Sequence, residues 1–276
     1  MKKVLIFLSI AFIFASCNKI QGPYVKKSGQ ADVDVEFPKL DTNTVYRKIL
    51  FEEYTGHCCI GCPEGHEILA NLQSIYGDTL IPVCIHAGYF AEPENGLFSY
   101  DFRTVAGEEL NSDFAITNNP QAIVNRVPGP LDKSSWSDAL RATDRTKYAA
   151  IQMINIYDNE DEILGVYTKT TMLRDYPGQV KMSLFLIEDN IIKPQKYSDH
   201  IDTNYVHNHV LRYGINGTYG EIVSANGYVQ KDSSYLYGYL QSFYQTDWVP
   251  EKCSVVAILW DQQEDKILQT EIKKVK

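Results

Sequence analysis

Three cysteines fall within five residues of the sequence, at Cys58, Cys59 and Cys62. Cys59 and Cys62 form a Cys-x-x-Cys pair, in which one thiol can attack a disulfide and the other can resolve the mixed disulfide. Pro63 follows, and proline is tolerated in the first turn of a helix. Unpaired N–H groups and the positive dipole end at such a helix start stabilise a thiolate. These residues predict thiol–disulfide chemistry, with Cys59 attacking and Cys62 resolving.

Cys58 is a rival partner for Cys59. A disulfide between the neighbours Cys58 and Cys59 would be strained, so we expect the Cys59–Cys62 pairing. Cys84 lies in an apolar run and is expected to be an inert buried thiol, and Cys253 is expected to be free. A second hypothesis keeps the Cys59–Cys62 disulfide but makes it structural, in a protein that binds a partner and catalyses nothing.

Metal binding is a further alternative, because thiolates and imidazoles suit Cu(I) or Zn(II). His66 comes four residues after Cys62, on the same face of the expected helix, so Cys58, Cys62 and His66 form a candidate set. His207 and His209 would share one face of a strand but have no third ligand nearby. Neither set has a diagnostic ligand pattern, so the sequence predicts no metal and no other cofactor.

The elements around the dithiol alternate between strands and helices. Apolar spacing and turn residues predict strands at 46–54, 80–86 and 121–127, and helices at 63–76, 105–114 and 135–148. This order predicts an α/β domain over residues 46–148. From residue 149 onward the pattern consists of strands without helices. It predicts an all-β, immunoglobulin-like sandwich over residues 149–276.

The first residues predict export. Lys2 and Lys3 precede an apolar run of about half the roughly 20 residues that span a bilayer, and small residues follow it. We interpret residues 1–16 as a signal peptide. Cys17 comes next and resembles the lipidated cysteine of the bacterial lipobox, which implies a lipid anchor in the cell envelope. Residues 17–45 lack periodicity and are expected to form a flexible tether.

Charge and motifs exclude several classes of function. The formal net charge is −9, which argues against nucleic acid as a partner. The sequence has no phosphate-binding loop and no dinucleotide fingerprint, so no nucleotide is expected either. An exported chain can hold disulfides, which agrees with a dithiol working outside the cytoplasm.

Residues 46–148 resemble the thioredoxin fold. Glu53, six residues before Cys59, matches the buried acid beneath the dithiol in that fold, and Pro120 matches its cis-proline. The resemblance implies that Cys59 is the exposed nucleophile and that Glu53 moves a proton. It also implies that Asn119, Pro120 and His57 border a substrate groove, and that the Asn119–Pro120 bond is cis.

The mature chain resembles the twenty-eight-kilodalton outer-membrane-protein (Omp28-related) lipoprotein family. The similarity rests on three segments of the sequence: Thr55-Gly56-His57, Val124-Asn125-Arg126, and His207 to Arg212 followed by Asn216-Gly217-Thr218. The resemblance implies a thioredoxin-like domain, an immunoglobulin-like sandwich and an outer-membrane location. It supplies no established activity.

The preferred hypothesis is a lipid-anchored envelope protein that exchanges thiols and disulfides with other envelope proteins. The alternatives are a non-catalytic surface binding or assembly protein with a structural dithiol, and a copper-binding thioredoxin relative. The three differ in whether the reduced protein turns over disulfide substrates.

Overall fold

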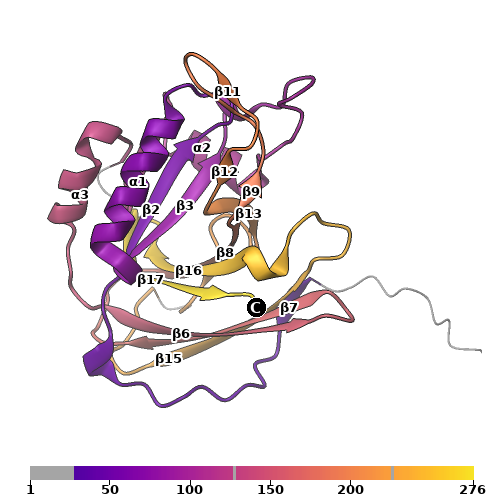
Figure 1. The fold of residues 1–276 in the computed structure, drawn as a ribbon. Coiled ribbons are helices and arrows are strands. Elements are labelled where there is room, and N and C mark those ends of the chain that lie inside the picture. Colours follow the sequence, from indigo (N-terminus) through magenta and orange to yellow (C-terminus); the bar gives the residue numbers. More distant parts are fainter. Residues whose placement is uncertain (1–27, 127–128, 225–226) are drawn as a thin grey trace, which may run out of the picture.

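The computed structural model describes residues 28–126, 129–224 and 227–276. Within these residues, a nine-stranded mixed sheet forms the centre of the molecule (Figure 1). Its strands in spatial order are β17 (Lys266–Lys274), β16 (Cys253–Asp261), β8 (Val180–Glu188), β13 (Val210–Gly214), β3 (Leu80–His86), β2 (Ile49–Thr55), β4 (Gln121–Val124) and β5 (Leu131–Asp132), with β14 (Glu221–Ile222) paired to β8.

Three helices pack against the β2–β3–β4 end of this sheet. They are α1 (Cys62–Tyr76), α2 (Val105–Asp113) and α3 (Trp136–Ala142). Apolar residues of α1 and α3 pack on one face, where Trp136 lies edge-on to Phe51 with ring centroids 5.1 Å apart. Leu110 of α2 packs in the cluster on the opposite face. The helices therefore bury both faces of the sheet beside the cysteines.

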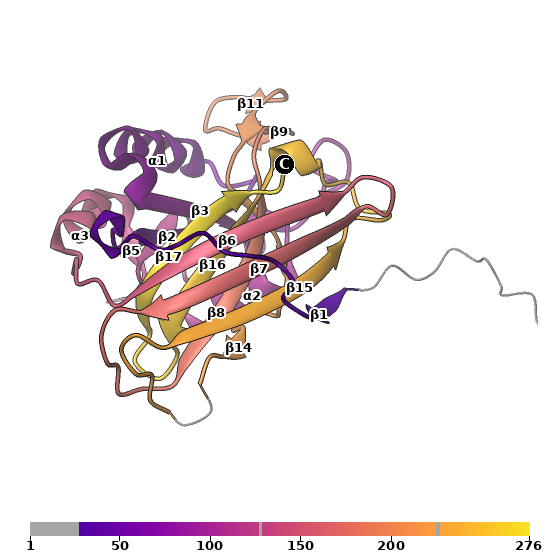
Figure 2. The ribbon, with the colours of Figure 1, turned by 90° about the horizontal axis from the view of Figure 1, so that it is seen from below.

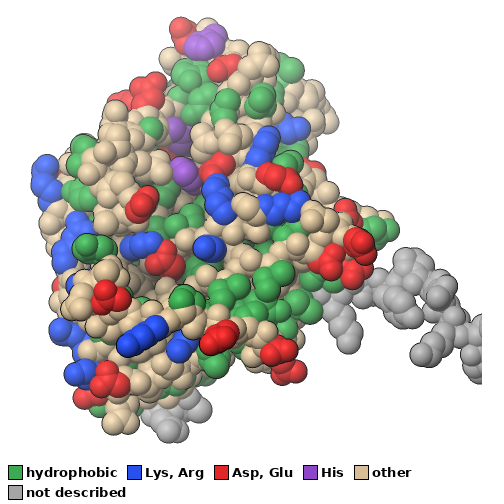
Figure 3. All heavy atoms as spheres, turned by 60° about the horizontal axis from the view of Figure 1, so that its bottom comes forward, with side chains coloured by type: hydrophobic (Ala, Val, Ile, Leu, Met, Phe, Trp, Pro, Cys, Tyr) green, Lys and Arg blue, Asp and Glu red, His purple; other side chains and the backbone are tan. Residues whose placement is uncertain are grey.

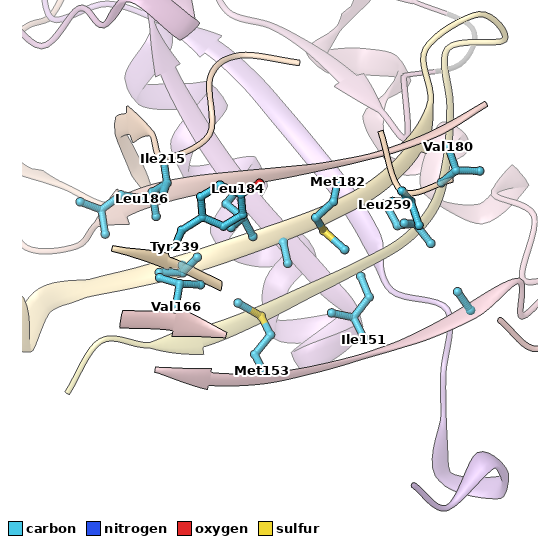
Figure 4. Close-up of a cluster of buried hydrophobic side chains, with 14 of the residues drawn as sticks. Ile151, Met153, Val166, Val180, Met182, Leu184, Leu186, Ile215, Tyr239 and Leu259 are labelled. Atoms are coloured by element: carbon cyan, nitrogen blue, oxygen red, sulfur yellow. The ribbon is translucent and has the colours of Figure 1, made fainter. Parts of the chain in front are cut away.

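A second, four-stranded antiparallel sheet covers the other end of the large sheet (Figure 2). Its strands are β1 (Gly29–Ala31), β15 (Ser234–Ser242), β7 (Ile163–Met172) and β6 (Ala149–Asp158). Their inward side chains meet those of β8, β16 and β17 in a large apolar cluster, part of which Figure 4 shows between the two layers. Tyr239 and Val166 lie on the four-stranded side of this cluster, facing Leu184 and Leu186 of β8.

Strand β13 joins the two ends of the large sheet. It pairs in parallel with β3 through Val210 and Cys84, and antiparallel with β8. Strands after residue 149 therefore complete the sheet that β2 and β3 begin. The two-layer packing is present, but a separate immunoglobulin-like sandwich is not confirmed, because one layer belongs to the shared sheet. The division into domains at residue 149 stays a prediction.

Two predicted elements differ in extent. The helix expected at 135–148 ends at Ala142, because Thr143 adopts an extended conformation and polar residues follow it. The strand expected at 121–127 ends at Val124, because Asn125 and Arg126 both have positive φ. Their side chains point to specific partners: the Leu50 backbone N–H donates to Asn125 Oδ1, and Arg126 pairs with Glu52.

Part of the expected tether is ordered. Residues Gly29–Ala31 form β1, which pairs antiparallel with the edge of β15. Backbone groups alone make these bonds, so an aperiodic sequence can add a strand to an open edge. The predicted signal peptide at 1–16 and the predicted lipidation site Cys17 lie outside the described residues.

Several short elements complete the fold. Between β8 and β13 run β9 (Ile191–Ile192), β10 (Gln195–Lys196), β11 (Ile201–Asp202) and β12 (Val206–His207). Short 3-10 helices occur at Thr42–Thr44, Gly77–Thr79, Tyr89–Ala91, Lys133–Ser135 and Pro250–Lys252. In the part of the chain that the structure describes, none of the helices has the length and apolar character needed to cross a membrane.

Candidate active site

A disulfide joins Cys59 and Cys62 at the start of α1, with a Cα–Cα distance of 5.5 Å. Cys62 is the first residue of the helix, and Cys59 lies in the turn that precedes it. Cys58, Cys84 and Cys253 are free and buried. The pairing predicted from the spacing is confirmed.

Gly56 allows the turn before the cysteines to lie against the chain at Phe90. A Cβ atom at position 56 would be 2.3 Å from the Phe90 carbonyl oxygen, so no other residue fits there without movement of the backbone. The same oxygen accepts a hydrogen bond from the Cys58 N–H at 3.0 Å. This close approach gives a physical reason for the glycine in the Thr55-Gly56-His57 segment.

Pro120 faces the dithiol from the start of β4. The Asn119–Pro120 peptide bond is cis, as the resemblance implied. Cys59 Sγ lies 3.4 Å from the Asn119 carbonyl oxygen. A Cβ atom at Gly65 would be 2.9 Å from Glu53 Oε1 and 3.0 Å from Pro120 Cγ. Three predicted site residues, Glu53, Asn119 and Pro120, therefore come together under the first turns of α1.

Glu53 is completely buried on β2, beneath the helix. Burial raises its pKa to about 8, although the Cys84 thiol partly opposes this rise by donating to Glu53 Oε2 at 3.5 Å. The other carboxyl oxygen, Oε1, has no hydrogen-bond partner among the described residues. A carboxyl with a pKa near neutrality can accept and release a proton within one reaction cycle.

The disulfide is less accessible than predicted. Cys59 is 2% exposed and Cys62 is 0% exposed, so Cys59 is not the exposed nucleophile that the resemblance implied. Ile60 between them is 56% exposed, which shows that the turn reaches the surface while its sulfur atoms do not.

A segment that we call the strap, residues 189–209, contains β9 to β12 and lies against the turn that carries the dithiol. Figure 1 shows its orange strands beside the ends of β2 and β3. The buried Gln195 side chain donates from Nε2 to the Cys59 carbonyl at 3.0 Å. The Lys196 N–H donates to the His57 carbonyl at 2.9 Å. The strap is therefore hydrogen-bonded to the main chain of the turn that carries the dithiol.

His57, which is expected to border a substrate groove, is also buried. Its ring stacks on Phe98 with centroids 5.5 Å apart, and only 1% of the residue is exposed. Burial lowers the pKa of its imidazole. In this arrangement His57 supports the turn below the strap and does not border an open groove.

Cys58 is suited neither to attack nor to metal binding in this state. Burial, followed by the negative charge of Glu94, raises the pKa of its thiol to about 11. Throughout the described ranges, no group of three or more His, Cys, Asp or Glu side chains is arranged to hold a metal ion. His66 instead contacts Thr55 and Tyr205.

A cavity of about 230 Å³ lies between α1, the end of β3 and the strap. Four of its lining residues are histidines: His66, His86, His207 and His209. Burial lowers the pKa of His66 to about 4 and that of His207 to about 3, so both rings are neutral at pH 7. Histidine side chains also reach the surface of the face shown in Figure 3, among interspersed acidic and basic groups.

No motif or spacing in the sequence predicts Gln195 or Tyr205 at this site. Both lie in a segment without periodicity, and Gln195 acts on main-chain carbonyls. The paired histidines His207 and His209 were the only signal that this region contributes polar side chains to a common place. Their partners are the Lys193 carbonyl and the Asp189 and Gln73 side chains.

Two solved structures are similar to this chain in fold. HBP35 of Porphyromonas gingivalis matches with a TM-score of 0.62 and 14% identity, over 84% of this chain and 76% of that chain. A crystal structure from Agrobacterium tumefaciens matches with a TM-score of 0.51 and 13% identity, over 84% of this chain and 96% of that one. These likenesses show the fold, which is a mixed α/β, HBP35-like architecture.

The family model of outer membrane protein Omp28 matches residues 107–276. The chain therefore belongs to the Omp28 family, as its segments predicted, and this membership implies an outer-membrane location. No curated protein matches the sequence. The matched range begins within α2 and includes Pro120 and the strap, but it does not include Cys59 and Cys62.

Proposed function

We propose that this protein exchanges thiols and disulfides with other envelope proteins through Cys59 and Cys62. One observation carries the proposal: the Cys59–Cys62 disulfide lies at the start of α1, beside Pro120 and above the buried carboxyl of Glu53. A disulfide with only a structural role would need no proton acceptor with a pKa near 8 beneath it.

In the direction that reduces a substrate disulfide, the protein starts with Cys59 and Cys62 as thiols. The Cys59 thiolate attacks one sulfur of a substrate disulfide, forming a mixed disulfide and releasing a substrate thiolate. Glu53 takes the proton of the Cys62 thiol, and the Cys62 thiolate attacks Cys59 Sγ. The second substrate thiolate leaves and the Cys59–Cys62 disulfide forms, so two electrons have passed to the substrate. The reverse sequence oxidises a substrate dithiol.

The arrangement around the dithiol supports a thioredoxin-like unit over residues 46–148. Strands β2 and β3 are parallel and β4 runs antiparallel to β2. Helices α1 and α3 pack on one face and α2 on the other. We place substrate recognition at Asn119 and Pro120, which lie next to Cys59.

The direct test is turnover of a protein disulfide by the reduced protein, with the reduction potential of the Cys59–Cys62 pair measured on the same sample. We expect catalytic turnover in the wild type and none in Cys59→Ser. Absence of turnover in the wild type would favour the second candidate, a binding or assembly protein. That candidate is supported by the low exposure of Cys59, because a structural disulfide needs no access.

Weakening the strap should expose the disulfide. Gln195→Ala removes the donor to the Cys59 and Gly56 carbonyls, so we expect dithiothreitol to reduce the Cys59–Cys62 disulfide several-fold faster. Timed alkylation and mass spectrometry would measure the rate. Gln241→Ala is the matched control, because Gln241 is also buried but lies on β15 and bonds to Ser242. Equal rates in both variants would show that the strap does not control access.

Membrane attachment is proposed to depend on Cys17. Replacing Cys17 by serine should release the protein from the membrane fraction, since acyl chains are the hydrophobic anchor that we infer. Cys253→Ser, which changes a buried free thiol, should leave the protein in that fraction. Fractionation with a high-salt wash measures both. A Cys17→Ser protein that still sediments with membranes would refute the lipid anchor.

A further inference from the structure

We infer that His66 and Tyr205 form a proton path between the buried carboxyl of Glu53 and the histidine-lined cavity beside α1. The inference rests on the proposed thiol–disulfide chemistry, in which Glu53 takes a proton from Cys62. A base that accepts a proton in each cycle must also return it to solvent, and Glu53 has no exposed surface through which to do so.

The path begins at the unpartnered oxygen of Glu53. Glu53 Oε1 lies 3.6 Å from His66 Nε2 and makes no hydrogen bond to any of the described residues. His66 projects from α1, one turn after Cys62. Because burial raises the pKa of Glu53 to about 8 and lowers that of His66 to about 4, both groups are neutral in most molecules at pH 7, and the contact is then not an ion pair. The ionised minority of Glu53 is the form that takes the Cys62 proton. An approach of a few tenths of an ångström would make the contact a hydrogen bond.

The path continues through the second ring nitrogen. His66 Nδ1 lies 2.6 Å from the Tyr205 hydroxyl, and Thr55 Oγ1 lies 3.1 Å from Nε2. Tyr205 belongs to the strap, and both His66 and Tyr205 line the cavity. The imidazole therefore connects the buried carboxyl on one side to a cavity-facing hydroxyl on the other.

The groups around this path favour a neutral relay. Cys84 faces Glu53 from β3, and Tyr205 faces His66 from the strap. The nearby His209 adds to burial in lowering the pKa of His66. A neutral imidazole has one N–H and one free lone pair, so it can accept a proton at one nitrogen while it releases one at the other.

The transfer balances without any electron movement. The O–H bond of the Glu53 carboxylic acid breaks and an N–H bond forms at His66 Nε2. The N–H bond at Nδ1 breaks as the Tyr205 oxygen gains that proton and passes its own to cavity water. The cavity, about 230 Å³ in volume and lined by His86 with two unpartnered nitrogens, is large and polar enough for water.

The first experiment follows the proton itself and needs no substrate. At pH 6 Glu53 is protonated, and its carboxylic acid band in the infrared shifts when the protein is mixed into D₂O. We expect this shift to be about tenfold slower or more in His66→Gln and Tyr205→Phe. His200→Gln is the matched control, because His200 also lies on the strap but is 55% exposed and outside the path. Unchanged exchange in His66→Gln and Tyr205→Phe would overturn the inference.

The second experiment tests the path during turnover. His66→Gln should lower multiple-turnover rates by a similar factor, and added imidazole should restore them by replacing the missing ring in the cavity. Mixed-disulfide formation in Cys62→Ser should not change when His66→Gln is added, since that step does not use Glu53. A slow variant that imidazole does not rescue would assign His66 a structural role only. A wild type that shows no turnover, together with slower H/D exchange at Glu53 in His66→Gln and Tyr205→Phe, would support the proton path and refute the proposed function.

Discussion

Cys62→Ser should accumulate mixed disulfides with envelope proteins through Cys59, and Cys59→Ser should accumulate none. In the Cys62→Ser variant nothing resolves the bond that Cys59 forms, so nearly every turnover ends in a trapped complex. Cys59 lies in the turn before α1, where N–H groups and the helix dipole stabilise its thiolate. Non-reducing electrophoresis of envelope fractions, followed by mass spectrometry of the linked peptides, measures the effect.

Cys58 provides the control for this experiment. Its thiol stays protonated at neutral pH because burial raises its pKa to about 11. Cys58→Ser combined with Cys62→Ser should therefore trap as many partners as Cys62→Ser alone. Trapping that persists in a Cys59→Ser/Cys62→Ser variant would assign the reactivity to Cys58. Absence of trapping in Cys62→Ser would favour the binding-protein hypothesis.

Arg126→Met should destabilise the fold more than any surface substitution. Arg126 and Glu52 are both inaccessible to solvent and form a two-pronged ion pair at 2.8 and 3.1 Å. The guanidinium also lies 4.1 Å from the ring centroid of Trp260 on β16. Removing one partner leaves a buried, unpaired charge, which costs about 3–5 kcal/mol. Urea denaturation followed by circular dichroism would measure the loss in free energy of unfolding.

Two variants make this prediction specific. Glu52→Met combined with Arg126→Met removes both charges and should recover part of the stability, because no charge remains unpaired. Arg141→Met is the surface control, because Arg141 pairs with Asp138 while both side chains are mostly exposed. We expect Arg141→Met to cause no measurable change in the free energy of unfolding. An Arg126→Met protein as stable as Arg141→Met would contradict the account.

The Cys59–Cys62 pairing could be predicted because the two cysteines are close in sequence and a disulfide between Cys58 and Cys59 would be strained. The place of Glu53 beneath the dithiol was implied by the resemblance to the thioredoxin fold, and a strand, a turn and a helix that follow one another in the chain produce it. The burial of Cys59 could not be predicted in this way. Gln195, far away in the sequence, contacts the turn through hydrogen bonds to main-chain oxygens, which every residue type offers.

The pairing of strands from both parts of the chain in one large sheet could not be predicted for a different reason. Alternation and turn residues identify strands, but they do not say which strands pair. One signal of the pairing is present in the sequence: β16 and the second half of β8 contain continuous apolar runs. Such runs are typical of strands buried on both faces, as in the middle of a covered sheet, whereas a two-layer sandwich strand alternates. Phe185 and Leu184 indeed pack into clusters on opposite faces.

The strap leaves the large sheet and returns to it at neighbouring positions. Glu188 at the end of β8 pairs with Val210 at the start of β13, and Asp189 accepts from the His209 N–H across the base. The two ends of the strap therefore lie next to each other. A short hairpin turn can replace the strap while β8 and β13 stay paired. A variant in which a short turn replaces residues 189–209 can therefore be designed from this pairing.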